Sequence, residues 1–260
     1  MDDYHNKVQD FIDNNNFTIL GKDPTKLFQN RIKATIKDCQ EIIHKDNKMK
    51  YTNLNSTAPN IRGLPKVHKE GCPIQPIINW HNAPAYKLTK LLNKLVQLYV
   101  LLPNTFNVKS SVHLINDLLG IPYKKDLQLI SFDIENMYPS IPTDELVRIL
   151  KGMCIENQLE EKTTNELVKI THTILEQNYF TFRNQCYFQN AGLAMGAPSS
   201  AVLSEIYLQH LEHPELLRYV ITQNNITGYF RYVDDILIVC DENCTDIHEV
   251  HGASNSLAPR

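Results

Sequence analysis

The chain has 260 residues, of which 42% are hydrophobic and 21% are charged. This composition is ordinary for a soluble globular protein, and the length allows one or two domains with a sizeable core. The net charge of −3 argues against a protein that binds polyanions over its whole surface.

The cellular compartment follows from what the sequence lacks. The chain opens MDDYHNKVQD, without a basic leader or an apolar signal segment, and no apolar run approaches the roughly 18 residues of a membrane span. The six cysteines form no CxxC pair. We therefore expect an intracellular protein with reduced thiols, and no signal peptide or transmembrane segment.

The first 58 residues are polar and predict helices. Ile32, Ile36 and Ile43 recur at helical spacing with basic residues between them, and nothing here suggests chemistry. The next stretch, NSTAPNIRGLPKVHKEGCPIQPII, is rich in proline and glycine and predicts loops and short strands.

Residues 62–98 carry a local charge of +5, although the whole chain is acidic. The stretch AYKLTKLLNKLVQLY predicts a helix with leucines on one face and lysines on another. A stripe of this kind can hold phosphates. Against Glu70 alone stand six basic residues, Arg62, Lys66, Lys69, Lys87, Lys90 and Lys94.

The stretch LQLISFDIENMYPSIP predicts a strand that ends in an acidic residue. Leu129, Ser131 and Asp133 share one face, and Ile130 and Phe132 share the other. A helix is predicted for SSVHLINDLLG before this strand, with Ser110 or Ser111 as its cap and Gly120 as its stop, and another from residue 143 after it. Asp133 is thus at the carboxyl end of a core strand, where folds often place reactive groups.

Further along, NYFTFRNQCYFQ predicts a hairpin that turns at Arg183, Asn184 and Gln185. The segment AGLAMGAPSS then opens a helix. Its small residues permit the close approach of a ligand.

The stretch FRYVDDILIVC places two carboxylates, Asp234 and Asp235, between apolar strands. One interpretation is a tight hairpin turn with two solvated aspartates. The other adds Asp133: if the hairpin pairs beside strand 127–134, three carboxylates meet and repel one another unless cations neutralise them. Mg²⁺ accepts one or two carboxylates together with substrate phosphates, and two ions roughly 4 Å apart can drive an in-line phosphoryl transfer.

FDIENMY, AMGAPSS and YVDD resemble motifs A, B and C of reverse transcriptases, in their usual order. RGLPKVHK, QPIINWHNAPAYKLTKLL, AGLAMGAPSSAVLSEIYLQ and FRYVDDI are similar to the Penelope-like class of retroelement polymerases. The resemblance extends from about residue 17 to about residue 243.

The resemblance implies a site for two Mg²⁺ or Mn²⁺ ions. Asp133 and Asp234 match the two metal-ligating aspartates, and the carbonyl of Ile134 matches a backbone ligand. Asp235 matches a weaker ligand, although a simple turn residue remains an alternative for it. Residues 133, 234 and 235 are the implied catalytic set, and we expect the carboxyls of 133 and 234 within about a dozen ångströms of each other.

The resemblance also implies a nucleotide site. Lys66 and Lys69 match a basic segment that holds the triphosphate, and Tyr138 matches an aromatic gate against a 2′-hydroxyl. Met195 and Gly196 match the loop beneath template and nucleotide. Solvated lysines, a core tyrosine and an ordinary helix start remain the plainer alternatives.

Two departures from the family pattern matter. Gln75 replaces the usual arginine, and glutamine gives no charged, bidentate grip on phosphate. The pattern also implies further palm strands, a thumb and often a GIY-YIG endonuclease domain after the last residue here, so we expect a C-terminally truncated protein.

The fold class expected is α+β, a right-hand polymerase with fingers and an incomplete palm, the thumb missing. The expected domains are a helical N-terminal extension (1–58), fingers (59–124), a palm (125–245) and a polar tail (246–260). The expected reaction is addition of dNTPs to a DNA primer on an RNA template, in the nucleus. The alternative is a weak or inactive remnant that at most binds nucleic acid. A phosphohydrolase with a DxDx motif is disfavoured because Glu135 occupies its second acidic position.

Overall fold

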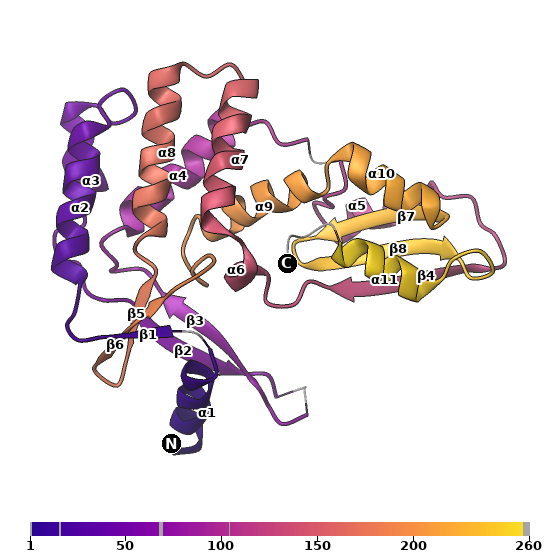
Figure 1. Cartoon of the computed structure of the whole chain (residues 1–260), viewed down its shortest axis with the longest axis horizontal. Helices are drawn as coiled ribbons and strands as arrows, with labels where there is room; N and C mark the ends of the chain where they lie inside the picture. Colours follow the sequence, from indigo (N-terminus) through magenta and orange to yellow (C-terminus); the bar gives the residue numbers. More distant parts are fainter. Residues whose placement is uncertain (1, 16, 68–69, 104, 257–260) are drawn as a thin grey trace. The chain divides into compact units, whose positions relative to one another are not determined.

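The computed structural model describes residues 2–15, 17–67, 70–103 and 105–256 (Figure 1). The chain divides into two compact units, residues 1–101 with 138–204 and residues 102–137 with 205–260. The division passes through two helices, α6 (Met137–Ser140) and α9 (Ser200–Leu211).

The first unit combines helices with one mixed sheet. Its elements are α1 (Asp2–Asp13), β1 (Phe17–Leu20), α2 (Thr25–Asp38), η1 (Lys45–Asn47), α3 (Lys48–Tyr51), β2 (Asn60–Pro65), β3 (Ile74–Asn79), α4 (Tyr86–Tyr99), α7 (Thr143–Glu156), α8 (Glu161–Leu175), β5 (Tyr179–Phe182) and β6 (Gln185–Gln189). The strand order is β1-β6-β5-β2-β3.

The β5–β6 hairpin turns at the predicted Arg183 and Asn184, whereas Gln185, also predicted to be in the turn, is the first residue of β6 and pairs with Phe182. Arg183 and Asn184 have φ of 48° and 64°, and a positive φ at both central residues is the pattern of a type I′ turn. Helices α2, α4, α7 and α8 lie side by side in this unit (Figure 1). The predicted leucine face of α4 is buried, with Leu88 and Leu92 fully inaccessible.

The second unit is built on a three-stranded antiparallel sheet of order β4-β8-β7. Its elements are α5 (Ser111–Leu119), β4 (Leu127–Asp133), α10 (Pro214–Gln223), β7 (Ile226–Tyr232), β8 (Asp235–Asp241) and α11 (Ile247–Asn255). Ser110 caps α5 by accepting a hydrogen bond from the His113 amide, and Gly120 follows its last residue, as the sequence predicts.

One face of this sheet carries the core of the second unit. Leu217 and Val220 of α10 and Val250 of α11 pack with Ile238 and Cys240 of β8. The opposite face carries Leu129, Ser131 and Asp133, which are exposed. Segment 106–108 runs along β7, where the Arg231 amide donates to the Phe106 carbonyl and the Val108 amide donates to the Arg231 carbonyl.

The segment expected to be a polar tail contains helix α11 instead. Asp246 caps the helix by accepting a hydrogen bond from the His248 amide, and Val250 is completely buried. A polar composition concealed this helix because only Ile247, Val250 and Ala253, spaced three residues apart, give it an apolar side. Likewise, the N-terminal 58 residues contain strand β1 besides their helices.

Candidate active site

Two of the candidate carboxylates lie opposite each other across the β4–β8 ladder. Asp133, the last residue of β4, pairs with Asp235, the first residue of β8. The Ile134 amide donates to the Asp234 carbonyl over 3.0 Å, which makes the Asp133–Asp235 pair a non-hydrogen-bonded one. In such a pair the Cβ atoms are about 5 Å apart. The antiparallel register thus brings together two acids that are about a hundred residues apart in sequence.

The third carboxylate is in the turn between β7 and β8. Tyr232 pairs with Asp235, so Val233 and Asp234 form a two-residue loop. Val233 has a φ of 58°, whereas Asp234 is not in the positive region, and this combination is the pattern of a type II′ turn. A left-handed conformation is costly for a β-branched residue, so the tip of the hairpin is strained.

This arrangement suits divalent cations only in part. Among the residues that the structure describes, no group of three or more His, Cys, Asp or Glu side chains is arranged to hold a metal ion. The expected three-carboxylate cluster is therefore not preformed; like charges repel. A facing pair of exposed carboxylates with a third in the adjacent turn still fits Mg²⁺, which takes one or two carboxylates and completes its shell with water and phosphate.

A cavity of about 560 Å³ opens beside Asp235 in the second unit. It lies against the face of the sheet that the core helices do not cover. Its lining includes Lys109, Ser131, Phe230, Tyr232, Asp235 and Leu237. A cation, two aromatic rings and a carboxylate in one cavity can receive a ligand that is partly anionic and partly flat.

One basic candidate of the first unit, Lys66, lies directly after β2, in the β2–β3 hairpin. The Lys66 amide donates to the Pro73 carbonyl at the loop end of the hairpin, next to the paired residues Pro65 and Ile74. Lys69 lies outside the described residues. Gln75 is exposed on β3 and pairs with Leu64 of β2.

Backbone hydrogen bonds hold the loop that contains Gly196, residues 190–199, between β6 and α9. The Ile78 amide of β3 donates to the Met195 carbonyl, and the Leu193 amide donates to the Tyr138 carbonyl. Gly196 has a φ of 95°, and a Cβ there would stand 2.3 Å from the Ile78 carbonyl oxygen. Only glycine fits this position, which explains the residue type that the sequence singled out.

A second cavity, of about 500 Å³, links these elements within the first unit. Arg62 and Leu64 of β2, Ile77 of β3, and Gly196 and Pro198 of the loop line it. His81 and Tyr86, stacked with ring centroids 5.1 Å apart, also line it. Arg62 was predicted only as part of the basic stripe, although alternation along β2 places it on the face of Leu64.

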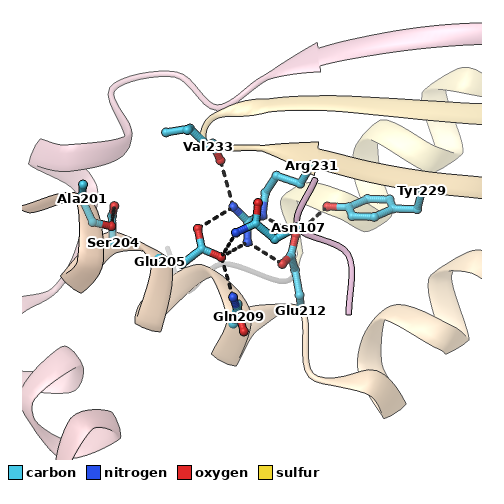
Figure 2. Close-up of polar contacts among 9 residues, drawn as sticks. All are labelled: Asn107, Ala201, Ser204, Glu205, Gln209, Glu212, Tyr229, Arg231 and Val233. Atoms are coloured by element: carbon cyan, nitrogen blue, oxygen red, sulfur yellow. Dashed lines mark hydrogen bonds and ion pairs between the residues drawn. The ribbon is translucent and has the colours of Figure 1, made fainter. Parts of the chain in front are cut away.

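Sequence reasoning missed an ionic cluster behind the hairpin of the second unit. Arg231 is completely buried and forms ion pairs with Glu205 and Glu212 (Figure 2). Burial disfavours ionisation of Glu205, but hydrogen bonds from Arg231 and Gln209 outweigh it and hold the pKa below its usual value. Burial raises the pKa of Glu212, against the opposing effect of Arg231. The seven-residue spacing of the two glutamates was the available signal.

The fold is similar to that of solved polymerase structures. Telomerase from Candida albicans in complex with the TWJ fragment of telomeric RNA aligns with a TM-score of 0.56 and 13% identity, over 98% of this chain and 44% of that chain. Apo telomerase from Candida tropicalis truncated from its C-terminal domain aligns with a TM-score of 0.58 and 12% identity, over 96% of this chain and 50% of that chain. This chain thus spans half or less of the length of these structures and shares their mixed α/β polymerase fold.

The chain belongs to the reverse transcriptase family. Residues 80–256, more than half of the chain, match the family described as Reverse transcriptase (RNA-dependent DNA polymerase). No curated protein matches the sequence significantly. In the part of the chain that the structure describes, no helix has the length and apolar character needed to cross a membrane.

Proposed function

We propose that this chain is the nucleotidyl-transfer domain of a reverse transcriptase, which adds dNTPs to the 3′-hydroxyl of a DNA primer on an RNA template. The observation that carries the proposal is the register that sets Asp133 against Asp235, with Asp234 in the adjoining turn. Membership of the reverse transcriptase family supports the same reaction.

Within that family, the motifs quoted above favour a Penelope-like element. We assign fingers to residues 59–124 and a palm to residues 125–245, and an intracellular, nuclear location goes with this origin. The order of the motifs supports these assignments. The polymerase fold over nearly the whole chain is consistent with them.

Asp133 and Asp234, together with the Ile134 carbonyl, are proposed to hold two divalent cations, with Asp235 as a weaker ligand. When bound, such ions activate an attacking hydroxyl and stabilise a leaving oxygen in phosphoryl transfer. The protein contributes position: the β4–β8 register fixes one carboxylate against another, and the turn fixes the third. The cavity with Lys109 beside Asp235 suits the phosphate and bases of a primer end.

The residues of the first unit are proposed to bind the incoming nucleotide. Lys66 and Lys69 would attract the triphosphate, and Gln75 would hydrogen-bond to it without adding charge. Tyr138, Met195 and Gly196 would shape the space for sugar and base. Ile78 holds the backbone of Met195 and leaves no room for a side chain at Gly196, which gives this space a fixed wall.

Primer extension on an RNA template with Mg²⁺ or Mn²⁺ tests the proposal. We expect incorporation by the full chain, loss of at least about a hundredfold in Asp234→Asn, and activity near that of the parent in Glu242→Gln, an exposed acid beyond the far end of β8. Equal incorporation by the parent and Asp234→Asn would remove the catalytic assignment. No incorporation by any of them, with retained binding of an RNA–DNA duplex, would instead support the nucleic-acid-binding remnant.

A further inference from the structure

The side chain of Arg231 makes every contact that a guanidinium can offer to its surroundings. Its Nε and Nη2 donate to the two carboxylate oxygens of Glu212 over 2.6 and 2.9 Å. Its Nη1 and Nη2 donate to the two oxygens of Glu205 over 3.0 and 2.8 Å. A fifth bond, from Nη1, goes to the Val233 carbonyl over 3.1 Å (Figure 2).

Three neighbouring side chains donate further hydrogen bonds to the two glutamates. Asn107 and Gln209 donate to Glu205, and the Tyr229 hydroxyl donates to Glu212 (Figure 2). A buried ion cluster of this kind costs desolvation that its own attractions repay only when all groups are satisfied. Such a cluster therefore need not stabilise the fold. The hydrogen bond from Arg231 to the Val233 carbonyl, a group outside the ion cluster, suggests a different role for it.

That bond ends on the strained residue of the hairpin. Val233 holds a φ of 58° between Tyr232 and Asp234. A strained conformation persists only where the surrounding structure holds it. The backbone of Arg231 is itself fixed, since its amide and carbonyl are bonded to Phe106 and Val108. Arg231 is therefore anchored along its main chain and through both glutamates, and it can hold the Val233 carbonyl in place.

We propose that Arg231 is a positioning residue, which holds Val233 in its left-handed conformation and thereby sets Asp234 and Asp235 for divalent cations. The inference rests on the proposed function, because it concerns the carboxylates assigned to the metal ions. A lysine could keep the charge, but it lacks the planar fork that reaches two carboxylates and a carbonyl together.

The first test compares Arg231→Lys with Tyr229→Phe in the full chain. Mn²⁺ binding, followed by the electron paramagnetic resonance signal of free Mn²⁺, is the readout, together with kcat and KM for single-nucleotide incorporation. We expect Arg231→Lys to weaken Mn²⁺ binding by about tenfold or more, as losses of groups behind metal ligands commonly do. Tyr229→Phe removes only the hydroxyl that donates to Glu212 and keeps all five bonds of Arg231. Its Mn²⁺ affinity is expected to stay within about twofold while its stability in urea falls. A folded Arg231→Lys protein with the affinity of the parent would overturn the proposal.

A second variant covers the case in which Arg231→Lys does not fold. The triple change Arg231→Met, Glu205→Gln and Glu212→Gln removes all three charges together and leaves no buried ion unpaired, so it is expected to fold. It also removes the bond to Val233. Weakened Mn²⁺ binding in this protein supports the positioning role, and an affinity equal to that of the parent contradicts it.

The link to backbone strain is tested by adding Val233→Gly to whichever of these two proteins is folded. Glycine takes a positive φ without strain and needs no support from Arg231. We expect Val233→Gly to restore most of the lost Mn²⁺ affinity. Failure to restore any of it would show that Arg231 does not act through the conformation of the turn.

Asp234→Asn separates this inference from the proposed function. If Asp234→Asn binds Mn²⁺ as the parent does, the metal site itself is assigned wrongly, whatever Arg231 does. If Asp234→Asn loses Mn²⁺ binding while Arg231→Lys retains it, the metal site stands and only the role of Arg231 fails.

Discussion

Asp133 and Asp235 face each other across two antiparallel strands, with both side chains exposed. Directly opposed like charges weaken a strand pair by roughly 0.2–1 kcal/mol. The repulsion acts at the ends of two strands whose inner residues pack into the core of the second unit. A bound cation would turn this local weakness into an attraction.

Replacing Asp133 with asparagine should therefore have opposite effects with and without metal. In EDTA, Asp133→Asn is expected to raise the free energy of unfolding by up to about 1 kcal/mol, because one repelling charge is removed. With Mn²⁺ the parent should gain thermal stability by binding and Asp133→Asn should gain less. Thermal unfolding in both buffers checks this, with Glu242→Gln as the control for loss of one acid. An equal Mn²⁺ response in parent and variant would speak against a metal site at this pair.

Gly196→Ala should destabilise the first unit. A Cβ at this position would stand 2.3 Å from the Ile78 carbonyl oxygen, and the φ of 95° is unfavourable for alanine. We expect a loss of about 2 kcal/mol or more in urea unfolding. Gly152→Ala is the matched control, since Gly152 is in helix α7 and a Cβ added there would meet nothing within 4 Å; it should stabilise the protein by roughly 0.5–1 kcal/mol. Equal effects of the two changes would contradict the tight contact.

Acid should weaken the contribution of Glu205 to stability. Its pKa in the folded protein lies below its usual value, through hydrogen bonds from Arg231 and Gln209 that outweigh burial. The unfolded chain therefore takes up a proton first as the pH falls. The contribution is fully present above about pH 4.5 and is lost as the pH falls through the folded pKa.

Urea unfolding of the parent and Glu205→Gln at about pH 6 and about pH 3.5 measures this effect. The stability advantage of the parent should shrink at the lower pH. Glu156→Gln, at an exposed position at the end of α7, is the control. The free energy of unfolding of this variant should differ from that of the parent by the same small amount at both pH values. A parent advantage that grows on acidification would contradict the direction of the shift.

The thiols should differ widely in reactivity. Burial raises the pKa of Cys39 to about 12, with Glu166 adding to the effect, and burial raises the pKa of Cys154 to about 11. Cys244 is exposed. With a disulfide reagent at about pH 8, Cys244 should react at least about a hundredfold faster than the other two, because the thiolate is the reacting form. Cys244→Ser should abolish a fast phase that Cys154→Ser leaves unchanged; fast labelling of Cys154 in the folded protein would refute the prediction.

Much of the framework around the site could be predicted from local sequence. The leucine spacing of α4, the Arg183–Asn184 turn and the Ser110 cap are short-range signals, and each is confirmed. The alternation in β4 correctly placed Asp133 on the exposed face with Leu129 and Ser131, opposite Ile130 and Phe132. These features depend on residues within one or two turns of each other.

The remaining features depend on contacts between distant segments. The cluster of Arg231 with Glu205 and Glu212 forms only where strand β7 packs against the end of helix α9. No feature of the sequence FRYVDD predicts this contact. Helix α11 is mostly polar, so its burial of Val250 follows only from the sheet beneath it. The position of Asp133 opposite Asp235 depends on which strands pair and in which register, and only the structure gives this pairing.

The two outer strands of the second sheet are not equivalent. Segment 106–108 already bonds to β7 at Arg231, whereas β4 is the outermost strand of its sheet in the described part of the chain. Unsatisfied amides and carbonyls at such a border attract another extended backbone. An additional strand, from the same polypeptide or a neighbouring molecule, would thus join this sheet by pairing with β4. It would then lie next to the aspartate that ends β4.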